Sequence, residues 1–201
     1  VTDAATRVAG LQSGEYEIAN AIPQDVAEQL SGNEEIELYI SANSFPAVIF
    51  NKKARAFKDQ KVREAANAAI NVDDMLIAAY SNEEFYVRDH ALVSPEQTGW
   101  YSEEGADVYN TYDPELAKQL LEESSYNGEQ VVILTARENM DEYNMTVVIE
   151  ESLKNIGMDV VLEESDYGTI LEKREDENVW DIFITSFAIR PMPTQYLFLN
   201  P

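Results

Sequence analysis

The 201-residue sequence contains no cysteine, which excludes disulfides, thiolate metal sites and cysteine nucleophiles. Positive charge is scarce, because 14 lysines and arginines stand against 38 acidic residues, and the formal net charge is −24. Nucleic acids and anionic membrane surfaces are therefore poor partners, since both are bound through clustered cations. The sequence also lacks any run of about 18 apolar residues, so no segment is expected to span a bilayer.

Signals for catalysis and cofactor binding are equally sparse. The single histidine, His90, lies in an irregular stretch, and a metal site needs several converging ligands, so we expect its side chain to face solvent. No glycine loop that could cradle a phosphate is present. We therefore predict a protein that is not an enzyme and uses neither a cofactor nor a metal. A hydrolase domain based on acidic side chains stays open as an alternative, although no spacing singles out a pair of carboxylates.

Hydrophobic residues make up 45% of the chain, which suffices for one substantial folded domain. In the first 80 residues, apolar spacing predicts helices over residues 4–12, 23–31, 62–70 and 73–80. Short strands are predicted at residues 16–19, 36–40 and 47–50, the second from the alternation of Ile36, Leu38 and Ile40. Periodicity then disappears from 81 to 112, and irregular segments of this length are commonly functional or mobile.

The remainder of the chain alternates between strand and helix patterns. Asp113-Pro114 supplies an N-cap and a first-turn proline, which predicts a helix start. Strands are predicted at 131–134, 158–162 and 180–186, with helices at 145–156 and 166–174 between them. This order implies an α/β fold with a mostly parallel sheet flanked by helices.

The stretch from Phe50 to Asn71 carries a recognisable pattern. It contains Phe50-Asn51 after an apolar strand, then Val62-Arg63-Glu64-Ala65, and a helix ending in Ala69-Ile70-Asn71. This succession resembles the signature of the extracellular solute-binding proteins of family 5, the ligand-capturing subunits of peptide and nickel ABC importers. We expect Arg63 itself to be structural, satisfying nearby carbonyls or acids.

Further segments resemble the same family in the same order. They are residues 3–7 with 11–18, the Tyr-Asp-Pro segment at 112–121, the helix–Gly–strand step from Leu153 to Leu162, and Trp180-Asp181-Ile182. Each motif is weak alone, but their common order across the chain is strong evidence. The last of them resembles the strand that ends at the family's ligand cleft.

The resemblance implies a periplasmic-binding-protein-like lobe of type II, the second lobe or domain III of a two-lobed protein. Residues 1–201 are expected to form this single lobe, with 1–20 as the crossover from a first lobe that is missing here. The implied function is capture of a peptide or similar small solute by lobe closure, followed by delivery to an ABC permease. The resemblance implies that the full-length protein is an extracellular lipoprotein anchored to the membrane. It also implies a monomer. A sensor or scaffold ectodomain is the non-transport alternative.

Ligand-facing residues are expected at the carboxyl ends of the strands. Three segments qualify: Asn43 to Pro46, which includes Phe45, then Asp166-Tyr167, and Phe187 to Pro193. The resemblance implies that Phe187 and Tyr167 are pocket aromatics. It also places a basic contact of some peptide binders at Arg174, where pairing with Glu175 or Glu177 is the simpler interpretation.

Arg190 departs from the family pattern. It occupies the position where peptide binders of the family typically carry an aspartate for the peptide amino group. The reversal of charge argues against recognition of an α-amino group at this position. A guanidinium could instead bind a carboxylate or phosphate through its planar fork, or it could pair with one of the chain's many acids.

Overall fold

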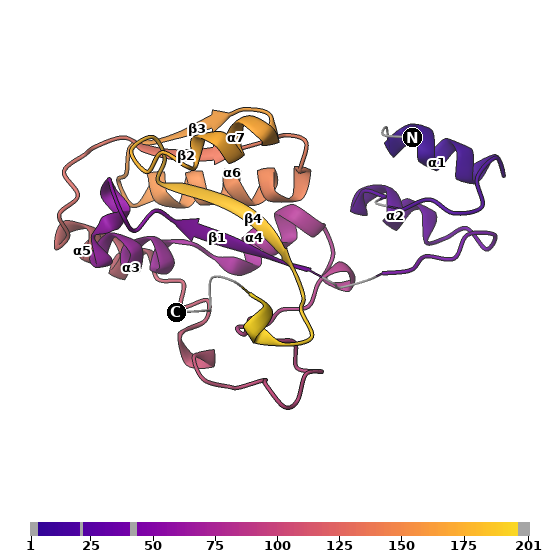
Figure 1. Cartoon of the computed structure of the whole chain (residues 1–201), viewed down its shortest axis with the longest axis horizontal. Coiled ribbons are helices and arrows are strands. Elements are labelled where there is room, and N and C mark those ends of the chain that lie inside the picture. Colours follow the sequence, from indigo (N-terminus) through magenta and orange to yellow (C-terminus); the bar gives the residue numbers. More distant parts are fainter. Residues whose placement is uncertain (1–3, 21, 41–43, 197–201) are drawn as a thin grey trace.

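The computed structural model describes residues 4–20, 22–40 and 44–196, and Figure 1 shows their arrangement. A four-stranded sheet with the order β1-β4-β2-β3 forms its centre. β2 pairs in parallel with both β3 and β4, whereas β1 pairs antiparallel with β4. The predicted mostly parallel α/β sheet is therefore confirmed. The strands are β1 (Ser44–Phe50), β2 (Val131–Thr135), β3 (Val160–Glu164) and β4 (Ile182–Ala188).

Helices follow the order that apolar spacing predicts. They are α1 (Ala4–Gln12), α2 (Gln24–Leu30), α3 (Gln60–Ala69), α4 (Val72–Tyr80), α5 (Pro114–Glu122), α6 (Met140–Asn155) and α7 (Tyr167–Lys173). Four short 3-10 turns accompany them: η1 (Ala56–Lys58), η2 (Glu83–Phe85), η3 (Ala106–Val108) and η4 (Pro193–Gln195). Figure 1 shows α1 and α2 set to one side of the sheet and its covering helices.

Alternate side chains of each central strand enter different hydrophobic clusters, as the pleat requires. In β4, Ile182 and Ile184 belong to a large cluster that α3, α4, α5 and α6 help to form. Phe183 between them packs in a smaller cluster with Trp180 and with Ile170 of α7. One face of the sheet is thus covered by four helices and the other mainly by α7.

The antiparallel direction of β1 matters for the site. β2, β3 and β4 end at one edge of the sheet, here called the carboxyl edge, and β1 begins there because it runs the opposite way. Phe45, near the start of β1, is therefore opposite Phe187, near the end of β4. Asn51, which follows β1, lies at the other edge, the amino edge, beside Asp181.

The alanine-rich helix α3 is scaffold. Val62, Ala65 and Ala66 are fully buried, and their small side chains allow α5 to pack closely against α3. The Phe57 ring stacks on Phe50, with centroids 4.9 Å apart and planes 8° apart. The Arg63 guanidinium donates to the carbonyl of Phe57 at 2.8 Å and to that of Lys58 at 3.0 Å. The structural role expected for Arg63 is confirmed.

The prediction of two strands near the start of the chain is wrong. The backbone at 16–19 and at 36–40 forms no strand, because a strand needs a partner and the described part of the chain offers none at either place. Tyr16 instead folds back on α1, where its backbone N–H donates to the Gly10 carbonyl at 3.0 Å. Ile36 and Leu38 are half-buried and Ile40 is 53% exposed, so none of the three alternating residues is fully buried.

The segment from 81 to 112 contains only short 3-10 turns, as expected, and it is tied to α4. The Asn110 carboxamide accepts a hydrogen bond from the backbone N–H of Val72 at 2.8 Å and donates to Asp73 at 3.1 Å. Arg88 reaches the same Asp73 carboxylate at 2.9 Å.

Among the described helices, none combines the length and apolar character that crossing a bilayer requires.

Candidate functional site

Three aromatic rings gather at the carboxyl edge. Phe45 of β1 lies 5.7 Å from Phe187 of β4, measured between ring centroids, because the two residues are direct cross-strand partners. Tyr196, after η4, meets Phe45 edge-on at 5.8 Å. Tyr196 is buried, whereas Phe45 and Phe187 are half-buried. This arrangement leaves part of two aromatic rings available at the end of the sheet.

Arg190 lies just beyond these rings, in the loop between β4 and η4. Its backbone N–H donates to the Tyr196 hydroxyl at 2.9 Å, and its carbonyl accepts from the Gln97 carboxamide at 2.7 Å. Gln97 belongs to the irregular segment 81–112, so this segment and the β4 loop meet here. Figure 1 shows both on the same side of the sheet. Within residues 4–20, 22–40 and 44–196, no carboxylate pairs with the Arg190 guanidinium.

Tyr167 also lies at the carboxyl edge, in the first turn of α7. Its hydroxyl is 3.5 Å from the Thr185 hydroxyl on β4, and its backbone N–H donates to the Glu138 carboxylate at 2.7 Å. A small pocket, with room for about one water molecule, is lined by Leu134, Thr135, Ala136, Glu142, Thr146, Tyr167, Ile170 and Ile184. Tyr167 and Phe187 thus reach the same edge from different elements.

The first turn of α6 brings acidic groups to this edge. The Glu142 carboxylate accepts from the Ser186 hydroxyl at 2.8 Å and from the Asn139 carboxamide at 3.2 Å. Burial raises the pKa of the neighbouring Asp141 carboxyl, and a hydrogen bond from Gln24 of α2 opposes this rise. Burial, with the charges of Asp141 and Glu142, raises the pKa of Tyr80 to about 12. Tyr80 therefore stays neutral at physiological pH.

The expectation of a solvent-facing His90 is wrong. Its side chain is only 10% exposed, because the ring packs edge-on against Tyr101 and lies between two acceptors. One ring nitrogen, Nδ1, is 3.4 Å from the Asp89 carboxylate, and the other, Nε2, is 3.0 Å from the Ser102 carbonyl. No group of three or more acidic or histidine side chains in the described ranges is placed to hold a metal ion.

One predicted contact, Arg174, is not brought to these rings by the structure. Arg174 follows the last turn of α7, near the start of β4, where its guanidinium lies 5.8 Å from the Phe183 ring centroid. It also lies 3.8 Å from Glu175, the simpler pairing that the sequence offers. Asn43 lies outside the described residues.

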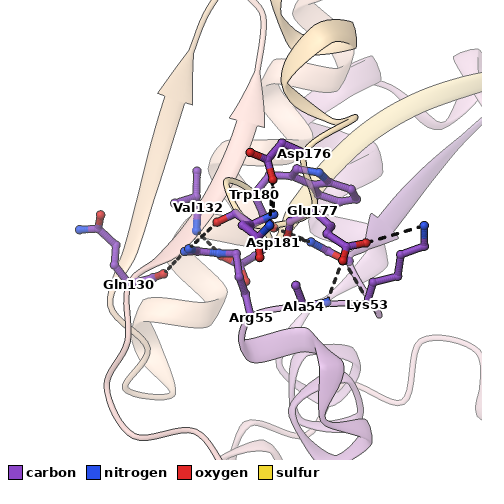
Figure 2. Close-up of polar contacts among 11 residues, drawn as sticks. Lys53, Ala54, Arg55, Gln130, Val132, Asp176, Glu177, Trp180 and Asp181 are labelled. Carbon is purple, nitrogen blue, oxygen red and sulfur yellow. Dashed lines mark hydrogen bonds and ion pairs between the residues drawn. The ribbon is translucent and has the colours of Figure 1, made fainter.

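A buried polar cluster at the amino edge was missed by sequence reasoning, and Figure 2 shows it. Asp181 is fully buried, and one oxygen of its carboxylate accepts from Arg55 Nε and from the Val132 backbone N–H, both at 2.8 Å. The other two nitrogens of the Arg55 guanidinium donate to the carbonyls of Gln130, at 2.7 Å, and Asn178, at 3.2 Å. Arg55 therefore joins the loop after β1 to the loops that precede β2 and β4.

Asn51 forms the second half of this cluster. Its side-chain NH₂ donates to the carbonyls of Glu177, at 2.7 Å, and Trp180, at 2.9 Å. Its side-chain oxygen accepts from the backbone N–H groups of Lys53 and Ala54, at 3.1 and 3.4 Å. The Phe50-Asn51 and Trp180-Asp181 motifs are thus in contact. A single acid before an apolar strand was the available signal for Asp181, but nothing in the sequence indicates its partner.

Comparison with known proteins assigns this chain to a family. The family model described as bacterial extracellular solute-binding proteins, family 5, middle part, matches residues 1–201. The chain belongs to this family. The family 5 resemblance carried by the sequence motifs is therefore confirmed.

Individual relatives and solved structures agree with this assignment. The chain is 30% identical over 199 residues to the probable peptide ABC transporter periplasmic-binding protein y4tO of Sinorhizobium fredii, covering 92% of this chain and 36% of that protein. DppA of Helicobacter pylori, solved with the peptide STSA, is 26% identical with a TM-score of 0.81, over 98% of this chain and 38% of that one. CtaP of Listeria monocytogenes shares the fold, with 19% identity and a TM-score of 0.85, over 100% of this chain and 41% of that one. The chain thus spans about a third of the length of the curated relatives it matches.

Proposed function

We propose that this chain is the second lobe, domain III, of a substrate-binding component of an ABC transporter that captures a peptide or similar small solute. The observation that carries the proposal is the aromatic and cationic edge formed by Phe45, Phe187 and Arg190 in a family 5 chain. Relatives named for peptide transport and a homologous structure holding a peptide support the ligand class. The remaining partners are a first lobe in the same protein and an ABC permease.

The proposed mechanism is closure of two lobes around the ligand. A half-buried aromatic edge gains burial when the opposite lobe covers it, so ligand and first lobe together stabilise the closed state. Hinge bending of this kind requires no chemistry, so we propose that the protein is not an enzyme. The full-length protein is proposed to act outside the cell as a membrane-anchored monomer, with residues 1–20 serving as the crossover between lobes.

The proposal predicts that ligand binding needs both lobes. The full-length protein should bind a mixture of neutral tripeptides in isothermal titration calorimetry, whereas residues 1–201 alone should show no measurable heat at the same concentrations. The physical reason is that this lobe supplies only part of the contacts and cannot exclude water from the ligand. Tight binding by residues 1–201 alone would contradict the two-lobed mechanism. Failure of the full-length protein to bind any peptide would contradict the ligand class.

A second prediction concerns the aromatic edge. Phe187→Ala in the full-length protein should weaken peptide binding about tenfold, since aromatic anchors supply a large share of binding energy when a partner desolvates them. Val179→Ala is the matched control, because Val179 is an apolar residue, 38% exposed, beside Trp180 at the amino edge. Equal affinities for the two variants in calorimetry would remove Phe187 from the site.

A further inference from the structure

We infer that Arg190 is the anion-recognising residue of the proposed ligand site, and that it selects peptides whose free carboxylate reaches this lobe. The inference rests on the proposed function and adds to it which charged group of the ligand faces this part of the protein. Arg190 is exposed and lies two residues after the end of β4 and three after Phe187. Its backbone contacts the hydroxyl of Tyr196, whose ring packs on Phe45, so Arg190 lies at the same end of the sheet as the half-buried rings.

The main chain at Arg190 is fixed on both sides. The Tyr196 hydroxyl accepts from its N–H, and the Gln97 carboxamide donates to its carbonyl. Tyr196 is itself buried and packed on Phe45, so the loop is anchored to the sheet. A fixed backbone with an exposed guanidinium lowers the entropy lost when a ligand is bound, compared with an arginine on an unanchored loop.

Most cations of this acidic chain are paired with a carboxylate. Acidic residues outnumber basic ones by 38 to 14, and most of the lysines and arginines lie within 4.0 Å of a carboxylate. Arg190 makes no such pair with any described residue. Lys52, Lys58 and Arg63 also form no ion pair within the described ranges. Lys52 follows Asn51 at the amino edge, and the other two lie in η1 and α3. Arg190 is thus an unpaired cation beside the proposed ligand edge.

Carboxylate chemistry fits this cation best. A guanidinium presents parallel N–H donors that match the two oxygens of a carboxylate, and the bond is stronger when both groups are charged. With a net charge of −24, the protein repels anions at long range, so a carboxylate-bearing ligand needs a local cation to bind. The inferred ligand class is therefore a peptide that directs a carboxylate toward Arg190.

Calorimetry on the full-length protein tests the inference with one defined probe in three forms. The probe is an equimolar tripeptide mixture built from Gly, Ala, Ser, Leu and Phe, made with free carboxyl ends, with carboxamide ends, and with carboxamide ends plus one glutamate. Arg190→Gln is compared with Arg190→Lys and with Lys52→Gln, which also removes one unpaired cation but at the amino edge. The wild type should bind the free acids about 10- to 100-fold more tightly than the amides.

The expected pattern is that Arg190→Gln abolishes this preference, Arg190→Lys keeps part of it, and Lys52→Gln leaves it unchanged. Recovery of affinity by the glutamate-containing amides would assign the contact to any carboxylate, and no recovery would assign it to the peptide end. Binding of acids and amides with equal affinity, or a preference that survives Arg190→Gln, would overturn the inference and leave peptide capture intact. No binding of any mixture by the wild type would instead overturn the proposed function and the inference with it.

Discussion

Asp181→Ala should lower the free energy of unfolding of this protein by about 3–5 kcal/mol. The Asp181 carboxylate is fully buried and receives the Arg55 guanidinium and the Val132 backbone N–H at 2.8 Å each. The substitution leaves the Arg55 side chain, which is 27% exposed, without its anion, and it leaves the buried Val132 N–H without an acceptor. The N–H then has a desolvation cost that nothing offsets, and the guanidinium keeps only its bonds to two neutral carbonyls. No other single charge in the described part of the chain is so completely enclosed.

Hydrogen–deuterium exchange of the full-length protein, followed by mass spectrometry, measures this effect locally. Peptides covering β2 and β4 should lose protection by the amount that corresponds to the lost stability. Glu175→Ala is the matched control, because Glu175 is 80% exposed and its nearest cation, Arg174, is 3.8 Å away, so a change within about 0.5 kcal/mol is expected. Unchanged protection of β2 in Asp181→Ala would show that the ion pair does not hold the amino edge.

The sequence predicts the elements that depend on nearby residues, and it fails where an element depends on residues far away in the chain. Periodicity located α3, α6, β2 and β4, because the alternation of buried side chains is imposed by the pleat and the helix pitch. The same argument failed at 36–40, where Ile36, Leu38 and Ile40 alternate without a neighbouring strand to pair with. A strand pattern is local, but the hydrogen-bonding partner that makes a strand is not.

The candidate site shows the same division. Phe45 and Phe187 could be proposed from strand ends, and the antiparallel pairing of β1 then explains why they meet. Asn51, Arg55 and Asp181 come from segments about 130 residues apart, and their contact depends on the completed sheet. Polar contacts between distant segments produce no repeating pattern in the sequence from which they could be predicted. His90 was misplaced for a related reason, since its burial depends on Tyr101 and Ser102 in an irregular segment.

The two edges of the sheet therefore have different roles. The amino edge is closed by a buried, nearly satisfied polar cluster, which joins β1, β2 and β4. The carboxyl edge keeps aromatic rings and a cation partly accessible. Such a division agrees with the proposed lobe closure, because binding energy is then not spent on reordering the sheet itself.

Asn51→Asp should destabilise the protein by about 2–4 kcal/mol at pH 7, although the two side chains have nearly the same shape. The Asn51 NH₂ donates to the carbonyls of Glu177 and Trp180, and the residue is 3% exposed. An ionised carboxylate turns both contacts into facing acceptors and places a second anion near Asp181. Asn67→Asp is the matched control, since Asn67 is exposed on α3 and should change stability by no more than about 0.5 kcal/mol.

The pH dependence separates this explanation from a simple loss of packing. Burial and facing carbonyls raise the folded-state pKa of the introduced carboxyl above its unfolded value, so protonation favours the folded state. The penalty of Asn51→Asp, measured by exchange against wild type at the same pH, should therefore be largest at pH 7 and shrink as the pH falls through the folded-state pKa. A protonated carboxyl regains one donor, but the Asn51 amide supplies two, so part of the penalty should persist. A penalty independent of pH between 4 and 7 would instead indicate that the charge is accommodated and that the lost donors of the Asn51 amide account for the penalty.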